Sequence, residues 1–298
     1  MDRVNADTEV RAHRFMIGTV ACAVVSDGTN TYRNPMPLLF ENALTADLDP
    51  VLRAHNIDPD AWHEYVSPYS ALLIDTGQHR VLVDTGAGGR APSNGKLVGN
   101  LRAEGVDPAA IDMVVLTHGH PDQIGGTLDA DQRSAFPNAR YVLWQDEWQF
   151  WTDKPDAMSV PVRDVLKDHV ANWRTFAQRQ LMPVERQLEL LDHDTDVAPG
   201  VTALAAAGHT PGHLVVEVTS RGERLMWTGD ALLRLVTVSH PEWYALVDLR
   251  PEQAVATRLR LLARAADQDM LVHAAHFPWP GLGRVRRQGS GFRWEPIN

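Results

Sequence analysis

Short apolar runs, each bounded by glycine or polar turn residues, predict a series of buried strands along this chain. In the first part of the chain the runs lie at residues 15–25, 71–77, 80–86, 113–116 and 140–143. In the second part they lie at residues 201–205, 214–218, 225–227 and 270–274. A helical period spans residues 161–180, and Pro251 fits the first position of a helix reaching about residue 266. Strands and then a helix, twice over, predict an α/β fold with two packed sheets and helices outside.

A length of 298 residues suits one large domain or two small ones, and we expect a single domain over residues 1–298 with two halves at about residues 12–180 and 200–298. The first apolar run is expected to end in a turn at residues 26–28, where Ser, Asp and Gly follow one another. Residues 29–69 carry several prolines and a short helical patch. We expect them to form an excursion near the functional site before the core resumes.

Composition and charge narrow the class of protein. A chain of 298 residues that is 44% hydrophobic can bury a sizeable core. A formal net charge of -10 argues against a nucleic-acid partner and against docking on an anionic membrane. The sequence contains neither a transmembrane run nor the apolar segment of a signal peptide. Cys22 is the single cysteine, which excludes an internal disulfide and a cysteine-rich zinc site. We therefore expect a cytoplasmic protein that acts on a small molecule, with a homodimer as an open alternative.

Two histidines and an aspartate follow the apolar run at residues 113–116 on one short loop. His118, His120 and Asp122 alternate, which in an extended segment places their side chains on one side. This arrangement is suited to binding a metal ion. A polar loop with helix-capping residues is the alternative explanation.

Three further metal-competent side chains come just after predicted strands. His209 lies in the glycine-bounded turn at residues 208–213, Asp230 follows the run at 225–227, and His276 follows the last run. Strand ends held by a rigid sheet can converge, whereas scattered histidines would not share this placement. Together with the first loop, they favour a metal site.

The combined motifs resemble those of the metallo-β-lactamase-fold hydrolases. The resemblance rests on His-x-His-x-Asp at 118–122, Gly-His-Thr-Pro-Gly-His at 208–213, Gly-Asp at 229–230, His276 and Val-Asp-Thr-Gly at 83–86. The segments at 275–283 and 291–294 look most like the methyl parathion hydrolase and quorum-quenching lactonase branch. The resemblance covers roughly residues 12–298 and implies a four-layer αββα sandwich of the metallo-β-lactamase type.

The resemblance also implies a role for each motif residue. Two metal sites are expected, with His118, His120 and His209 as ligands of the first and Asp122 and His276 as ligands of the second. Asp230 would bridge the two metals. Asp84 would not bind metal itself but would orient one of the ligands. Three neutral imidazoles suit Zn²⁺ and leave a fourth position for water, whose pKa a metal can lower to about 7. Asp122 would be the catalytic residue that orients this water and moves a proton.

Gln123 departs from the family pattern, which usually has a histidine there. Its amide oxygen is a harder and weaker donor than imidazole. One hypothesis is an asymmetric centre, in which zinc is firmly bound at the first site and Mn²⁺, Fe²⁺ or Co²⁺ can compete for a weaker second site. Another is that Gln123 hydrogen-bonds Asp122 or a water and the centre holds one metal. A third is that the protein has lost activity.

The expected function is hydrolysis of a small, fairly apolar ester-like substrate, and the resemblance implies a lactone first and an aryl ester or phosphotriester next. A mononuclear iron dioxygenase acting on a persulfide, and a relative that binds ligand without turnover, are the alternatives. His213 is expected to be structural. The aromatic cluster Trp144, Trp148, Phe150 and Trp151 would either pack in the core or wall the substrate pocket. Residues 38–40 would either cap that pocket or form a dimer contact.

Overall fold

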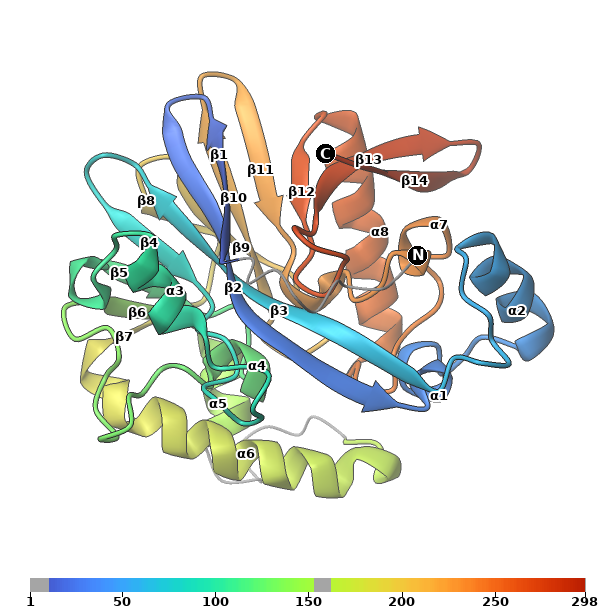
Figure 1. Cartoon of the computed structure of the whole chain (residues 1–298), viewed down its shortest axis with the longest axis horizontal. Helices are drawn as coiled ribbons and strands as arrows, with labels where there is room; N and C mark the ends of the chain where they lie inside the picture. Colours follow the sequence, from blue (N-terminus) through green and yellow to red (C-terminus); the bar gives the residue numbers. More distant parts are fainter. Residues whose placement is uncertain (1–10, 153–161, 298) are drawn as a thin grey trace.

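Two mixed β-sheets face each other in the computed structural model, which describes residues 11–152 and 162–297 (Figure 1). Within these residues the first sheet has seven strands in sequence order: β1 (Ala12–Ile17), β2 (Val20–Arg33), β3 (Glu64–Asp75), β4 (Arg80–Val83), β5 (Met113–Val115), β6 (Arg140–Trp144) and β7 (Leu188–Leu191). The second runs in reverse order from the last strand to the first: β14 (Gly291–Pro296), β13 (Leu282–Gln288), β12 (Leu271–His273), β11 (Glu223–Trp227), β10 (Leu214–Ser220), β9 (Val201–Ala205) and β8 (Thr195–Ala198).

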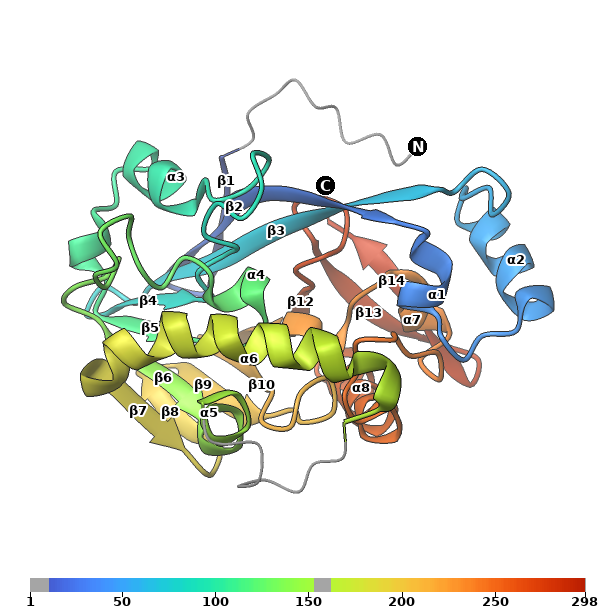
Figure 2. The same cartoon turned by 90° about the horizontal axis from the view of Figure 1, so that it is seen from below.

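Helices cover the outer face of each sheet. On the first sheet lie α3 (Leu97–Ala103), α5 (Gln145–Thr152) and α6 (Lys167–Leu181), and Figure 2 shows α6 running across this face. On the second sheet lies α8 (Pro251–Asp267), which begins at the predicted proline. The other helices of the described residues are α1 (Pro35–Leu39), α2 (Thr45–Ala54), α4 (Pro121–Ile124), α7 (Val236–Ser239), η1 (Pro108–Ala110), η2 (Asp164–Leu166), η3 (Met182–Gln187) and η4 (Gly229–Ala231). The helical period predicted over residues 161–180 starts at residue 161, which lies outside the described residues, and most of the rest is α6.

Three apolar layers hold these elements together. One lies between the sheets and joins residues such as Val83 and Val115 to Val216 and Trp227. The second packs the first sheet against its helices, and the third packs the second sheet against α8. The order helix, sheet, sheet, helix is the predicted αββα arrangement. Strands β4, β5 and β6 are parallel and lie in the middle of the first sheet. The other sheet covers one of their faces and helices cover the other, which explains why their sequences are continuous apolar runs.

The first predicted strand is wrong in its boundaries. The chain turns back at Gly18, whose φ of 55° favours glycine, so residues 15–25 belong to two strands of a hairpin. The expected turn at residues 26–28 is instead a bulge inside β2. The carboxylate of Asp27 explains the bulge, because it accepts hydrogen bonds from the backbone of Ala87, Gly95 and Leu97.

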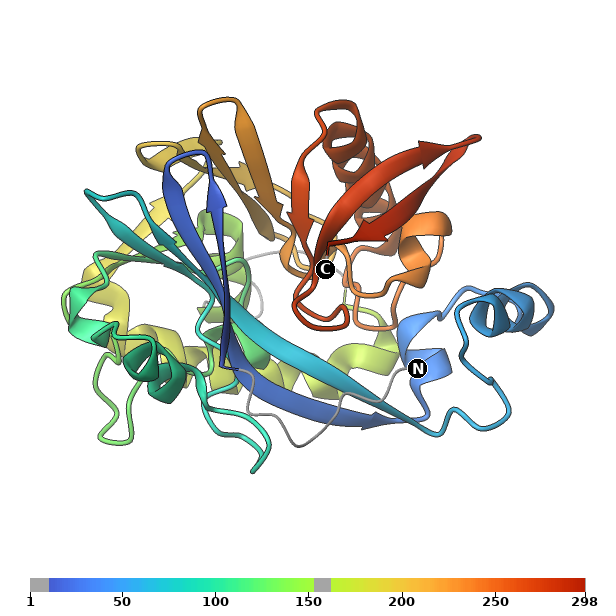
Figure 3. The same cartoon turned by 45° about the horizontal axis from the view of Figure 1, so that its top comes forward.

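The excursion is shorter than the predicted range 29–69. Its ends belong to β2 and β3, which pair as far as Arg33 and Glu64 and extend toward α1 and α2 (Figure 3). The helical patch expected inside it is α2. The sequence reading also missed the C-terminal hairpin of β13 and β14. Across the described ranges, none of the helices combines the length and apolarity needed to cross a membrane.

Candidate metal centre

The predicted site residues converge where strands of both sheets end. Asp84 follows β4, the loop with His118, His120 and Asp122 follows β5, and His209 follows β9. The remaining two residues, Asp230 and His276, follow β11 and β12. Because β4 and β5 are parallel to each other, as are β11 and β12, each pair delivers its loops to one edge of its sheet.

Four buried side chains form a first cluster. His120 Nδ1 lies 3.1 Å from His118 Nε2 and 3.0 Å from His209 Nε2. Asp230 Oδ2 lies 3.6 Å from His118 Nε2 and 3.3 Å from His209 Nε2. One ligand atom from each of the four residues lies within 4.8 Å of all the others. Three imidazoles and a carboxylate around one point are a donor set that suits Zn²⁺.

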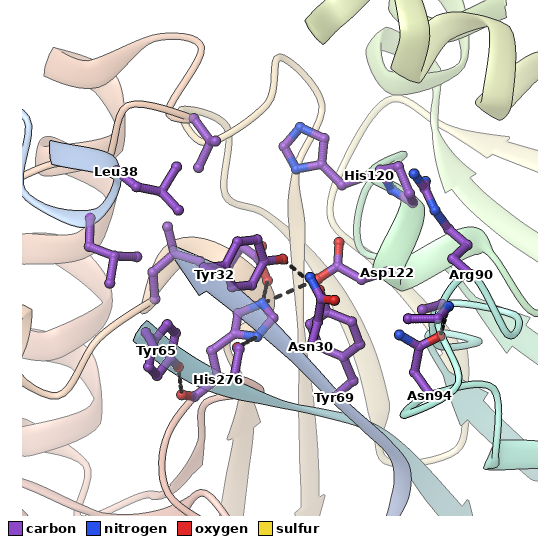
Figure 4. Close-up of a pocket in the computed structure, with 18 of the residues that line it drawn as sticks. Asn30, Tyr32, Leu38, Tyr65, Tyr69, Arg90, Asn94, His120, Asp122 and His276 are labelled. Carbon is purple, nitrogen blue, oxygen red and sulfur yellow. Dashed lines mark hydrogen bonds and ion pairs between the residues drawn. The ribbon is translucent and has the colours of Figure 1, made fainter. Parts of the chain in front are cut away.

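A second cluster shares Asp230 with the first. Its Oδ1 lies 3.2 Å from His276 Nε2, and Asp122 Oδ2 lies 3.5 Å from the same nitrogen. Asp230 therefore presents one oxygen to each cluster. Figure 4 shows Asp122 and His276 side by side at the cavity. Two carboxylates and one imidazole form a harder donor set than the first cluster.

The electrostatics of both clusters fit a cation. Burial lowers the pKa of His118 and His120 well below the usual value, so both rings are neutral and can donate a lone pair. Burial would also lower the pKa of His209 and His276, but nearby carboxylates raise them to about 9 and about 10. These shifts report negative charge that a divalent cation would also balance.

Groups outside the clusters fix the orientation of the rings. Asp248 Oδ1 lies 2.7 Å from His209 Nδ1, on the side away from Asp230. Ser67 Oγ lies 2.9 Å from His276 Nδ1. Hydrogen bonds to the remote ring nitrogen set the tautomer and strengthen the ligand. The sequence reading missed both groups, because neither lies in a recognisable motif.

Asp84 acts on the first cluster through Thr117. Its carboxylate accepts hydrogen bonds from Thr117 N at 2.8 Å and from Thr117 Oγ1 at 2.9 Å, and Thr117 Oγ1 lies 3.1 Å from His118 Nδ1. Trp227 Nε1 donates to the same carboxylate from the second sheet. Burial raises the pKa of Asp84 to about 7. Asp84, the predicted supporting carboxylate, thus orients the ring of His118 indirectly, through Thr117.

Gln123 hydrogen-bonds the shared carboxylate of Asp230, whereas the sequence suggested Asp122 or a water as its partner. Its Nε2 donates to Asp230 Oδ1 at 3.2 Å. Its Oε1 is buried and has no hydrogen-bond partner among the described residues. The amide N–H of Gln123 therefore contacts Asp230 Oδ1, the oxygen that faces the second cluster, while the amide oxygen of the same side chain is an unpaired acceptor.

A further buried carboxylate, Glu147, ties the two histidine loops together. Its Oε1 accepts from Gly119 N at 2.8 Å and also from the indole of Trp151. Its Oε2 accepts from Gly212 N at 2.8 Å. Gly119 lies between His118 and His120, and Gly212 lies in the turn that carries His209. The sequence offers no signal for this role beyond the acidic residue itself.

The histidine expected to be structural also contacts the site. His213 Nε2 accepts a hydrogen bond from the backbone N–H of Asp230 at 3.1 Å. Burial lowers the pKa of His213 to about 3, so its ring is neutral. It holds the backbone of the shared carboxylate, while its ring nitrogens stay outside the two clusters of potential metal ligands.

A cavity of about 330 Å³ opens onto both clusters. Leu38 and Leu39 line it, in agreement with the expectation that residues 38–40 cap the pocket. Phe40 is instead buried in an apolar cluster with Trp243. The predicted aromatic cluster does not line it: Phe150 and Trp151 lie on α5 and pack in the core, and Trp173 of α6 lines the cavity instead. Alternate residues of two strands also line it: Asn30 and Tyr32 of β2, and Tyr65, Ser67 and Tyr69 of β3.

Comparison with known proteins places this site in a family context. The family model described as the metallo-beta-lactamase superfamily matches residues 65–276. The solved structure of AidC, a dizinc quorum-quenching lactonase in complex with a product, is 26% identical with a TM-score of 0.88, over 97% of this chain and 98% of that one. The hydrolase AbOPH of the beta lactamase superfamily is 27% identical with a TM-score of 0.86, over 98% and 99%. A probable metal-dependent hydrolase from Staphylococcus aureus shares the fold at 18% identity and a TM-score of 0.78, over 95% and 99%.

Proposed function

This chain belongs to the metallo-β-lactamase superfamily, and from that premise we propose that it is a metal-dependent hydrolase of small, fairly apolar ester-like substrates. Lactones head the list, and aryl esters and phosphotriesters follow. The observation that carries the proposal is Asp230, which presents one carboxylate oxygen to each of two clusters of buried ligand atoms beside a cavity. A divalent metal bound there would acidify a water to a pKa of about 7 and polarise the bond to be cleaved.

The residues of the chain divide the remaining work. Asp122 is the more accessible of the two carboxylates that line the cavity, because its side chain is 17% exposed whereas that of Asp230 is 5% exposed. We assign Asp122 the role of orienting a water in the cavity, accepting its proton and returning that proton to the leaving group. Asp230 stays ionised: burial would raise its pKa, but His276 and His118 lower it well below the usual value.

The cavity supports a neutral substrate with an apolar part. Its volume of about 330 Å³ suits a small molecule. Leu38, Leu39, Leu233, Val247 and Trp173 supply apolar surface to its lining, and the strand residues described above supply hydroxyl and amide groups. The similarity to AidC, a quorum-quenching lactonase, supports placing lactones first.

A substrate panel tests this function. Lactones, aryl esters, phosphotriesters and the β-lactam nitrocefin are offered to protein loaded with Zn²⁺, Mn²⁺ or Co²⁺. We expect the largest kcat/KM for a lactone. Absence of turnover for every substrate and metal would contradict the proposal. Oxygen consumption by iron-loaded protein with glutathione persulfide would instead favour the oxidoreductase alternative.

We further propose that the two clusters bind metal unequally, with Zn²⁺ held firmly by the three histidines and a weaker second site open to Mn²⁺, Fe²⁺ or Co²⁺. Gln123 supports this asymmetry, because its amide N–H already hydrogen-bonds the oxygen of Asp230 that faces the second cluster. A cation held at that oxygen would compete with this hydrogen bond, and the amide would have to rotate for Gln123 Oε1 to serve as a weak ligand.

Replacing Gln123 with histidine is expected to strengthen the second site. Imidazole is a better zinc ligand than an amide oxygen, and the change removes the competing N–H, so we expect the second Zn²⁺ to bind at least about tenfold more tightly. Calorimetric titration of metal-free protein and metal analysis after dialysis measure this. The control Gln123→Leu removes the same N–H without adding a ligand and should gain clearly less affinity than the histidine variant. Two equally tight zinc ions in the unmodified protein would refute the asymmetry.

A further inference from the structure

Two tyrosine hydroxyls meet on the cavity wall that strands β2 and β3 form. Tyr32 pairs with Tyr65 in the sheet register, and Tyr69 pairs with Gly28. Successive residues of a strand point to opposite faces, so Tyr32, Tyr65 and Tyr69 share the face that lines the cavity. The hydroxyl oxygens of Tyr32 and Tyr69 lie 2.5 Å apart (Figure 4).

The pair leaves one hydroxyl proton free to act as a donor. Two hydroxyls carry two O–H groups, and the hydrogen bond between Tyr32 and Tyr69 uses one of them. The tyrosine that accepts this bond therefore has an O–H available for a third group. Accepting a hydrogen bond polarises that O–H and makes it a stronger donor.

Both phenols are protonated at neutral pH, because the ordinary pKa of a tyrosine hydroxyl is about 10. The side chain of Asn30 lies beside both hydroxyls and adds a neutral polar group. Tyr32 and Tyr69 line the same cavity as Asp122 and His276, and the ring centroids of Tyr69 and His276 lie 5.6 Å apart.

The backbone already joins the two strands without this hydrogen bond. The ladder between β2 and β3 runs from Ala21 and Asp75 to Arg33 and Glu64, with one bulge. A hydroxyl pair is thus not needed to hold the strands in register. Leu233, which lies three residues after Asp230 and also lines the cavity, offers no donor.

We propose that the Tyr32–Tyr69 pair is a catalytic hydrogen-bond donor to the carbonyl or phosphoryl oxygen of the substrate, an inference that rests on the proposed hydrolase function. Negative charge develops on that oxygen as the bond to the leaving group weakens. A neutral donor fixed beside it stabilises the transition state more than the bound substrate. Asn30 positions the pair and helps to exclude a competing water.

Removing the hydroxyls should lower kcat more than it changes KM. Loss of one donor to a developing oxyanion costs about 10²- to 10³-fold in kcat. We expect the double variant Tyr32→Phe/Tyr69→Phe to lose about 10²-fold in kcat on a lactone with KM within about threefold, and each single variant, which keeps one hydroxyl, to lose less. Tyr141→Phe is the matched control, because it removes a buried hydroxyl that contacts Ser134 and Thr127 outside the cavity.

A binding measurement separates this inference from the function itself. Hexylphosphonate carries tetrahedral oxygens that mimic the developing charge, whereas hexanol shares its chain and lacks them. Calorimetry should show phosphonate binding weakened at least about tenfold in the double variant and hexanol binding unchanged. If the unmodified protein hydrolyses nothing, the proposed function fails, and this titration alone decides the inference. Retention of kcat and phosphonate affinity within about threefold in the double variant overturns it.

Discussion

Replacing Asp230 with asparagine is expected to reduce hydrolysis by about 10³-fold or more, because two clusters of ligand atoms share this one carboxylate. Loss of an outer hydrogen-bond partner typically costs about 10- to 100-fold in metal affinity, and a shared ligand should cost more. Asparagine keeps the size of the side chain but removes the charge that balances His209 and His276. Turnover with excess Zn²⁺ and the metal content after dialysis measure the effect.

Asp248→Asn provides a graded comparison. Asp248 touches His209 on the side away from the shared carboxylate, so its loss should weaken binding at the three-histidine cluster by about 10- to 100-fold and leave the second cluster unchanged. Asp230→Asn should weaken both clusters. If Asp230→Asn keeps both metals and turns over substrate within about tenfold of the unmodified protein, the shared-ligand assignment is wrong.

The sequence predicts the part of the site that depends on local order. His118, His120, His209, Asp230 and His276 each come just after an apolar run, and the structure brings all of them together at strand ends. An apolar run fixes where a buried strand stops, so a polar residue directly after it is placed at the sheet edge. The two-sheet arrangement follows from the same runs, since each one has to be covered on both faces.

The supporting groups depend on packing between distant segments, which no local pattern records. Asp248 is 39 residues from His209 in sequence, and Glu147 reaches Gly119 and Gly212 across 28 and 65 residues. The cavity tyrosines lie in a segment that reads as an irregular excursion because its prolines obscure the strand alternation. The turn at Gly18 could not be predicted for a similar reason, because apolar residues continue on both sides of it and hide the boundary between β1 and β2.

The remaining large effect concerns Glu147, whose substitution by glutamine is expected to destabilise the fold and weaken metal binding together. The carboxylate accepts from both histidine loops, whereas an amide has one acceptor oxygen and would present its NH₂ to an N–H of Gly119 or Gly212. Each buried donor left unpaired costs about 1–3 kcal/mol, so we expect a loss of about 3 kcal/mol in the unfolding free energy.

Because Glu147 joins the loop of His118 and His120 to the turn of His209, its loss should also weaken zinc binding at the three-histidine cluster by about 10- to 100-fold. Urea denaturation of metal-free protein isolates the stability change from metal linkage, and calorimetry measures the affinity. Glu217→Gln is the matched control, since this glutamate is buried on β10 and pairs with Arg264 of α8, outside both clusters. It should lose stability while keeping its zinc affinity. If Glu147→Gln behaves in the same way, Glu147 supports the core alone, and the two histidine loops hold their geometry without it.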